Sequence, residues 1–178
     1  GGLSRLAASD SDREVRDQFV AWCREAGLSV RIDGIGNIFA RRAGTEDTLP
    51  PVVMGSHLDT QFNGGRFDGI LGVLGGLEVC RALDTIGHRT RRPIELVNWT
   101  NEEGARFSPP MVGSGTFTGA YTLDWAHGRV DEEGRRLGDE LARIGYRGEM
   151  EETPHAFDAY YELHIEQGPI LDREGMQV

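Results

Sequence analysis

Val52-Val53-Met54-Gly55, followed at once by Ser56-His57-Leu58-Asp59, is the stretch that determines the fold. A short and wholly apolar run is typical of a strand that is buried on both faces, as in a parallel sheet. Ile94 to Trp99 is a second run of this kind, and a helix is expected between the two, from about Asp68 to Leu83. Strands that alternate with helices in this way predict an α/β domain. We expect a largely parallel central sheet flanked by helices in a three-layer sandwich.

The flanking segments extend this pattern in both directions. Ser11-Asp12-Arg13-Glu14 predicts a capping box at the start of a helix that ends at Gly27. Residues 28–32 and 38–41 alternate like two paired strands, and Tyr160 to Ile165 predicts the last strand. Shorter helices are expected at residues 116–121, 123–126 and 137–144.

Composition and charge exclude several classes of protein. The chain has 178 residues, 19 basic and 29 acidic side chains and a formal net charge of −10. This charge argues against nucleic acid and against anionic membrane surfaces as partners, because both require a basic face. No apolar run approaches the roughly 20 residues of a membrane span, and no signal peptide opens the chain. We therefore expect a cytoplasmic protein in which Cys23 and Cys80 are buried free thiols.

Polar side chains gather where the predicted strands end. In an open α/β sheet the carboxyl ends of the strands form the ligand-binding crevice. We therefore expect the loops after the three strands to converge there. The candidate residues are His57, Asp59, Asp68, Glu102, Glu103, His164 and Gln167.

These residue types favour a metal site. Imidazoles and carboxylates suit Zn²⁺, Mn²⁺ and similar divalent ions. His57 and Asp59 are two residues apart in an extended segment, so that Asp59 can orient the imidazole from behind. Asp68 can bridge two ions. Of the adjacent acids Glu102 and Glu103, one can bind an ion while the other acts as a general base.

Each residue alone has a plainer interpretation. A His-x-Asp pair is often a surface pair, and paired glutamates are common on solvated helix faces. Asp68 could be an N-cap residue, and His164 could be a satisfied core histidine. Together, at strand ends with glycines on each side, they indicate a dinuclear metallohydrolase.

Four motifs also carry a family resemblance. They are Gly55-Ser-His-Leu-Asp-Thr-Gln, Asn63-Gly-Gly-Arg-Phe-Asp-Gly, Thr100-Asn-Glu-Glu-Gly-Ala-Arg-Phe and His164-Ile-Glu-Gln-Gly-Pro. In this order and spacing they resemble the amidohydrolase branch of the aminoacylase/carboxypeptidase-type dinuclear metallohydrolases. That branch contains N-carbamoyl-L-amino acid hydrolases, β-ureidopropionases and allantoate amidohydrolases.

The resemblance implies a role for each candidate residue. His57 and His164 would bind one metal ion, Asp68 would bridge, and Glu103 would bind the other ion. Glu102 would be the general base, with Asp59 behind His57, and Gln167 is similar to a substrate-contacting position. The cofactor would be two divalent ions per complete subunit, Mn²⁺ or Zn²⁺, with Co²⁺ and Ni²⁺ as alternatives.

The resemblance also implies parts that these residues do not supply. Residues 1–178 would form the N-terminal portion of a single catalytic domain. The C-terminal part of that domain, which bears a further histidine ligand, and a lid and dimerisation domain would be absent. We expect the chain alone to be inactive and the complete protein to be a homodimer through the missing domain.

The implied reaction is hydrolysis of a ureido C–N bond in a small molecule. The substrates would be N-carbamoyl-L-amino acids or N-carbamoyl-β-alanine, and the products the amino acid, ammonia and carbon dioxide. Thr60-Gln61 and Met111-Val112-Gly113-Ser114-Gly115 are closer to these members than to the allantoate enzymes. The alternatives are an allantoate amidohydrolase and a non-catalytic fragment that lacks the lid and the last metal ligand.

Overall fold

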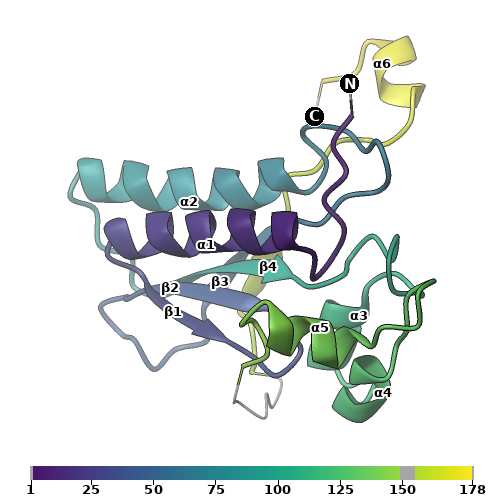
Figure 1. Ribbon diagram of the computed structural model, residues 1–178. Helices are drawn as coiled ribbons and strands as arrows, with labels where there is room; N and C mark the ends of the chain where they lie inside the picture. The colour runs from purple at the N-terminus through teal and green to yellow at the C-terminus, as the bar shows by residue number, and fades with distance from the viewer. Residues whose placement is uncertain (1, 149–154, 178) are drawn as a thin grey trace.

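The computed structural model describes residues 2–148 and 155–177. These residues form one five-stranded sheet in the order β1-β2-β4-β3-β5 (Figure 1). The strands are β1 Ser29–Ile32, β2 Ile38–Arg42, β3 Val52–His57, β4 Ile94–Trp99 and β5 Ala159–Tyr161. β3 runs parallel to β4 and β5, whereas β2 is antiparallel to both β1 and β4. Four strands therefore point the same way, which confirms the predicted largely parallel α/β sheet.

The two long helices cover one face of this sheet. In Figure 1, α1 Asp10–Glu25 and α2 Ile70–Thr85 lie side by side above the strands. The larger core cluster joins them to the sheet through residues such as Phe19, Leu77 and Leu96. A smaller cluster on Phe39, Val53, Val97, Trp99 and Phe117 forms the second core.

The remaining helices are short. They are α3 Val112–Phe117, α4 Leu123–His127, α5 Leu137–Arg143 and α6 Ile170–Glu174. α4 and α5 agree with the predicted positions within about one residue, but α3 lies earlier than the predicted helix at 116–121. In the described part of the chain, no helix combines the length and the apolarity that a membrane span requires.

The predicted capping box of α1 is wrong by two residues. The N-cap is Ser9, whose Oγ accepts a hydrogen bond from Asp12 N at 3.2 Å, and Asp12 Oδ2 accepts one from Ala8 N at 2.8 Å. Ser9 and Asp12 have the same Ser-x-x-acid spacing as Ser11 and Glu14. Asp12 also pairs with Arg16 in the core, Nε to Oδ2 at 2.8 Å, and both side chains are fully buried. Glu14 is exposed, so the earlier of the two patterns is the one that the core stabilises.

The last strand is shorter than predicted. β5 pairs with β3 from Val52↔Ala159 to Met54↔Tyr161 and then ends. Beyond it, the Glu162 carboxylate accepts hydrogen bonds from Ser56 Oγ at 2.5 Å and from Tyr160 OH at 2.8 Å. The chain is therefore held to β3 by side chains after Tyr161, and His164 lies in a loop rather than in a strand.

Both cysteines are buried free thiols, as predicted. Burial raises the pKa of Cys23 to about 12 and that of Cys80 to about 11. Neither thiol therefore forms a reactive thiolate near neutral pH.

α2 approaches β3 closely because glycine lies on its inner face. A Cβ at Gly72 would lie 2.7 Å from Leu163 O and 2.8 Å from Ser56 Cβ. A Cβ at Gly75 would lie 3.5 Å from Leu163 Cδ2, which is an ordinary contact. The absence of a side chain at Gly72 thus lets the helix, β3 and the segment after β5 meet.

We predict that Gly72→Ala destabilises the chain although alanine is the better helix former. Overpacking of a tight contact costs about 1–3 kcal/mol, more than the roughly 1 kcal/mol gained in helix propensity. Gly75→Ala is the matched control, because it gains the same propensity without the collision. Urea unfolding should place the Gly72→Ala midpoint below that of the unmodified chain and the Gly75→Ala midpoint at or above it. Equal midpoints for the two variants would contradict this packing.

Candidate metal centre

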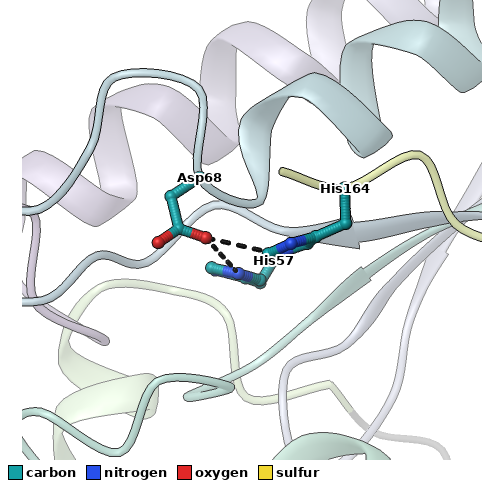
Figure 2. A group of neighbouring side chains, drawn as sticks. All are labelled: His57, Asp68 and His164. Carbon is teal, nitrogen blue, oxygen red and sulfur yellow. Dashed lines mark ion pairs between the residues drawn. The ribbon is translucent and has the colours of Figure 1, made fainter. Parts of the chain in front are cut away.

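Three segments that are distant in sequence bring His57, Asp68 and His164 together (Figure 2). His57 ends β3, Asp68 precedes α2 and His164 follows β5. Asp68 Oδ1 lies 3.7 Å from His57 Nε2 and 3.2 Å from His164 Nε2. One donor atom from each residue lies within 4.8 Å of the others, and His57 and Asp68 are buried. The family resemblance implied these two imidazoles and this carboxylate as metal ligands; the structure brings them together, and their binding of an ion stays a prediction.

Backbone carbonyls orient both imidazoles toward Asp68. His57 Nδ1 lies 2.8 Å from Asp59 O, and His164 Nδ1 lies 2.8 Å from Ile165 O. A carbonyl oxygen can only accept, so each Nδ1 carries a hydrogen, and in the neutral imidazole the lone pair is then on Nε2. His57 Nε2 is buried and has no hydrogen-bond partner among the described residues. A buried lone pair without a partner, facing a carboxylate, fits a metal ion.

Asp68 is free to serve the site because it does not cap α2. The helix begins at Ile70, its N-cap is Gly69, and no side chain bonds the first turn. Gly69 has φ +71°, and a Cβ there would lie 2.5 Å from the His57 ring. The interpretation of Asp68 as an N-cap residue is therefore wrong.

Gln167 holds the Asp68 carboxylate. Its Nε2 donates to Asp68 Oδ1 at 3.0 Å and to Oδ2 at 2.9 Å. The sequence predicted a substrate-contacting residue at Gln167. That role stays a prediction, and the contact with Asp68 places the side chain at the edge of the three-residue group.

Asp59 lies behind His57 but its carboxylate mainly binds the next loop. The distance from Asp59 Oδ1 to His57 Nδ1 is 3.9 Å, longer than a hydrogen bond. Asp59 Oδ1 accepts from Glu102 N at 3.1 Å and Oδ2 from Glu103 N at 3.2 Å. Burial raises the pKa of Asp59, and the neighbouring His57 and these two amides oppose the rise. Asp59 thus connects the ring of His57, through its carbonyl, to the backbone of the paired glutamates.

The paired glutamates point to different neighbours. Glu102 Oε2 lies 3.5 Å from His57 Nε2, and its side chain is about one-third exposed. Burial raises the pKa of Glu102, with Glu103 and Glu162 adding to the rise and His57 opposing it. Glu103 Oε2 accepts a hydrogen bond from Gln61 Nε2 at 2.9 Å, while its Oε1 is buried without a partner in the part of the chain that is described. Glu103 is not a member of the three-residue group, and its role as ligand of a second ion stays a prediction.

Sequence reasoning missed the apolar flank of this site. A recess of about 320 Å³ opens beside Glu102. Apolar side chains make up most of its lining: Trp99, Met111, Phe117, Phe157 and Tyr160. Glu162, which also lines it, is two residues before His164, so alternation in the predicted strand could have placed it near the site.

Comparison with known proteins finds a matching family model and similar proteins. The family model for the peptidase family M20/M25/M40 matches residues 53–178. An N-carbamoyl-L-amino-acid amidohydrolase of Rhizobium meliloti is 52% identical over 178 residues, which are all of this chain and 43% of that protein. A ureidoglycolate hydrolase of Oryza sativa subsp. japonica is 37% identical over 183 residues, covering 99% of this chain and 38% of that protein. The crystal structure of a hydantoinase/carbamoylase family amidase from Burkholderia ambifaria superposes with a TM-score of 0.94 at 56% identity. That match covers 98% of this chain and 43% of the other.

We predict that the chain retains about one divalent ion after dialysis against Zn²⁺ or Mn²⁺ and that His57→Ala loses it. Removing an ion-binding nitrogen should weaken the affinity by more than the roughly 10–100-fold that an outer hydrogen-bond partner contributes. His88→Ala, at an exposed histidine, is the control and should keep the ion. Elemental analysis of the folded proteins measures the ratio. A folded wild-type chain without metal, or His57→Ala with its ion intact, would contradict this site.

Proposed function

Because the chain belongs to the peptidase family M20/M25/M40, we propose that the protein it represents is a metal-dependent amidohydrolase acting on ureido C–N bonds. The substrates are N-carbamoyl-L-amino acids or N-carbamoyl-β-alanine, and the products are the amino acid, ammonia and carbon dioxide. The observation that carries this proposal is the buried and unpartnered Nε2 of His57, which faces Asp68 at 3.7 Å and Glu102 at 3.5 Å. The same nitrogen thus adjoins a metal-binding carboxylate and a candidate base.

The chain's residues divide into ligands and a base. His57, His164 and Asp68 would hold one ion, and Glu103, whose carboxylate accepts a hydrogen bond from Gln61, would hold the second together with Asp68. When bound, the two ions supply Lewis-acid activation of water and of the scissile carbonyl group. Imidazole and carboxylate donors suit Mn²⁺, Zn²⁺, Co²⁺ or Ni²⁺.

Glu102 moves the proton. Its carboxylate is not held by any arginine in the described residues, and its raised pKa makes it a better base than a solvated glutamate. Glu102 accepts a proton from the attacking water at a carboxylate oxygen and returns it to the leaving nitrogen. The Asp59 carboxylate fixes the backbone amide of Glu102 and therefore the path of this transfer.

The apolar recess supports carbamoyl amino acids over allantoate. The recess adjoins Glu102, so the substrate's side group can enter it while the ureido group lies at the base. Apolar walls stabilise an apolar side group by removing it from water, whereas the second ureido group of allantoate would lose hydrogen bonds there. Allantoate remains the alternative substrate.

The chain spans less than half the length of the relatives to which it is similar. We propose that residues 1–178 form the N-terminal portion of a catalytic domain that further chain completes. β5 pairs only with β3 among the described strands, and exposed apolar residues, Tyr161 and Leu163, lie at and beyond its end. The missing portion would add a late histidine ligand, a lid and a dimer interface. A non-catalytic fragment is the competing interpretation.

We predict that Glu102→Gln in the complete protein abolishes turnover and keeps the metal. The amide has the size of the carboxylate but cannot accept the proton, and loss of a general base costs about 100- to 10,000-fold in rate. Ammonia release measures activity, and elemental analysis measures the metal. Glu132→Gln, at an exposed acid, is the control with unchanged rate. A fully active Glu102→Gln variant would remove Glu102 from this role.

We also predict that the complete protein releases ammonia from N-carbamoyl-L-amino acids or N-carbamoyl-β-alanine and that residues 1–178 alone do not. Parallel assays with both of these substrates and with allantoate decide the substrate class. Activity toward allantoate only would overturn the proposed substrates. A measurable rate from residues 1–178 would overturn the proposed need for the further chain.

A further inference from the structure

The loop from Thr100 to Gly113 carries both glutamates of the site and returns to its starting point. It leaves the end of β4 and enters α3. Gly113 N donates to Thr100 O at 2.9 Å, and Met111 N donates to Glu102 O at 2.7 Å. The positions of Glu102 and Glu103 therefore depend on what holds the base of this loop.

Asn37, in the turn between β1 and β2, binds both ends of the loop with one side chain. Its Oδ1 accepts a hydrogen bond from Thr100 N at 2.9 Å, and its Nδ2 donates one to Gly113 O at 3.1 Å. The side chain is fully buried. One carboxamide thus supplies the acceptor and the donor that a peptide group of a neighbouring strand would supply.

Asp33 fixes the orientation of this carboxamide. Asp33 Oδ2 accepts from Asn37 Nδ2 at 2.7 Å, and Asp33 Oδ1 accepts from Asn37 N at 2.7 Å. The nitrogen of the carboxamide therefore faces two acceptors, Asp33 and Gly113 O, and the oxygen faces a donor. The reverse orientation would place oxygen against oxygen, so only one arrangement satisfies every group.

The contact between Asn37 and Gly113 is too close to accommodate a side chain at Gly113. A Cβ at Gly113 would lie 2.3 Å from Asn37 Oδ1 and 2.5 Å from Thr100 O. The Thr100 hydroxyl accepts in turn from Arg16 Nη2 at 3.3 Å, and Arg16 is fully buried. The two ends of the loop are thus in close contact with each other and with buried side chains of the core.

We propose that Asn37 is a positioning residue that sets the Glu102 and Glu103 carboxylates, an inference that rests on the proposed function. Among the described residues, the hydrogen bonds of the Asn37 side chain go to Asp33, Thr100 and Gly113 and not to the His57–Asp68–His164 group. Loss of the Asn37 side chain should therefore displace Glu102, the proposed general base, and Glu103, the proposed ligand of the second ion. The site of the first ion, at His57, Asp68 and His164, should be unchanged. This separation distinguishes a positioning role from a general loss of stability.

The first test compares Asn37→Ala with Asn98→Ala. Asn98 is an equally buried asparagine in β4 whose side-chain atoms have no hydrogen-bond partner among the described residues, so its removal leaves the loop contacts intact. Asn37→Ala leaves Thr100 N and Gly113 O without partners. Amide hydrogen exchange should accelerate at least about 10-fold within residues 100–113 in Asn37→Ala, but not in Asn98→Ala. The Co²⁺ affinity of the three-residue group should stay within about 3-fold in both variants, against the roughly 10–100-fold expected for an outer partner of that ion.

The second test uses the complete protein with its metal ions. Asn37→Ala should lower kcat by about 100-fold, the loss that a displacement near 1 Å can cause, with KM within about 3-fold. Asn98→Ala should keep kcat. If Asn37→Ala does not fold, Gly113→Ala disturbs the same contact from the loop side and should give the same split.

The outcomes separate the two proposals. Equal kcat in Asn37→Ala and Asn98→Ala, or exchange that accelerates uniformly over the chain, overturns the positioning role of Asn37. Full activity of Glu102→Gln removes Glu102 from the role of base, whereas no ammonia release by the complete protein from any of the ureido substrates overturns the proposed function. In either case the exchange measurement decides alone whether Asn37 holds the loop. An inactive Glu102→Gln with the expected Asn37→Ala profile supports both.

Discussion

The site depends on the close contact between the start of α2 and the end of β3. Gly69 lies against the His57 ring and Gly72 against Ser56 and Leu163, at distances that no Cβ could tolerate. This contact sets Asp68 between two imidazoles that belong to different strands or loops. Without it, the helix would stand further from the sheet, and the carboxylate could not reach both nitrogens. The His57–Asp68–His164 group therefore depends on helix–sheet packing rather than on local sequence.

Much of the fold and the site could be predicted because the ligands lie where buried strands end. The apolar runs ending near Gly55 and at Trp99 give the strand positions, and chain order then brings His57 and Glu102 to one edge. His164 reaches the same edge although β5 ends at Tyr161, three residues before it. The Ser56–Glu162 hydrogen bond replaces the missing strand pairing there and keeps the segment along β3.

The rest could not be predicted because it depends on partners distant in sequence. Two Ser-x-x-acid patterns are available at the start of α1, from Ser9 and from Ser11, and only the structure shows that the acid of the first, Asp12, is the buried one. The carboxylate of Asp59 binds the amides of Glu102 and Glu103, whereas the short His-x-Asp spacing suggests only a contact with the ring. Asn37 lies in the turn between β1 and β2, where asparagine is common in hairpins, so its type alone indicates no further role. Its two bonds to Thr100 and Gly113 become visible only when β2 is placed beside β4.

Charge explains why backbone groups, rather than carboxylates, orient the two imidazoles. Five carboxylates gather around the site: Asp59, Asp68, Glu102, Glu103 and Glu162. Among the described residues, no arginine forms an ion pair with any of them, so they repel one another in a partly buried region. If carboxylates also oriented the two imidazole rings, two further negative charges would lie in this region and increase the repulsion. Because carbonyl oxygens take that task, Asp68 and Glu103 stay available to cations, and divalent ions are the charge that would relieve the repulsion. The raised pKa of Glu102 has the same origin, since burial and neighbouring acids both disfavour its ionised form.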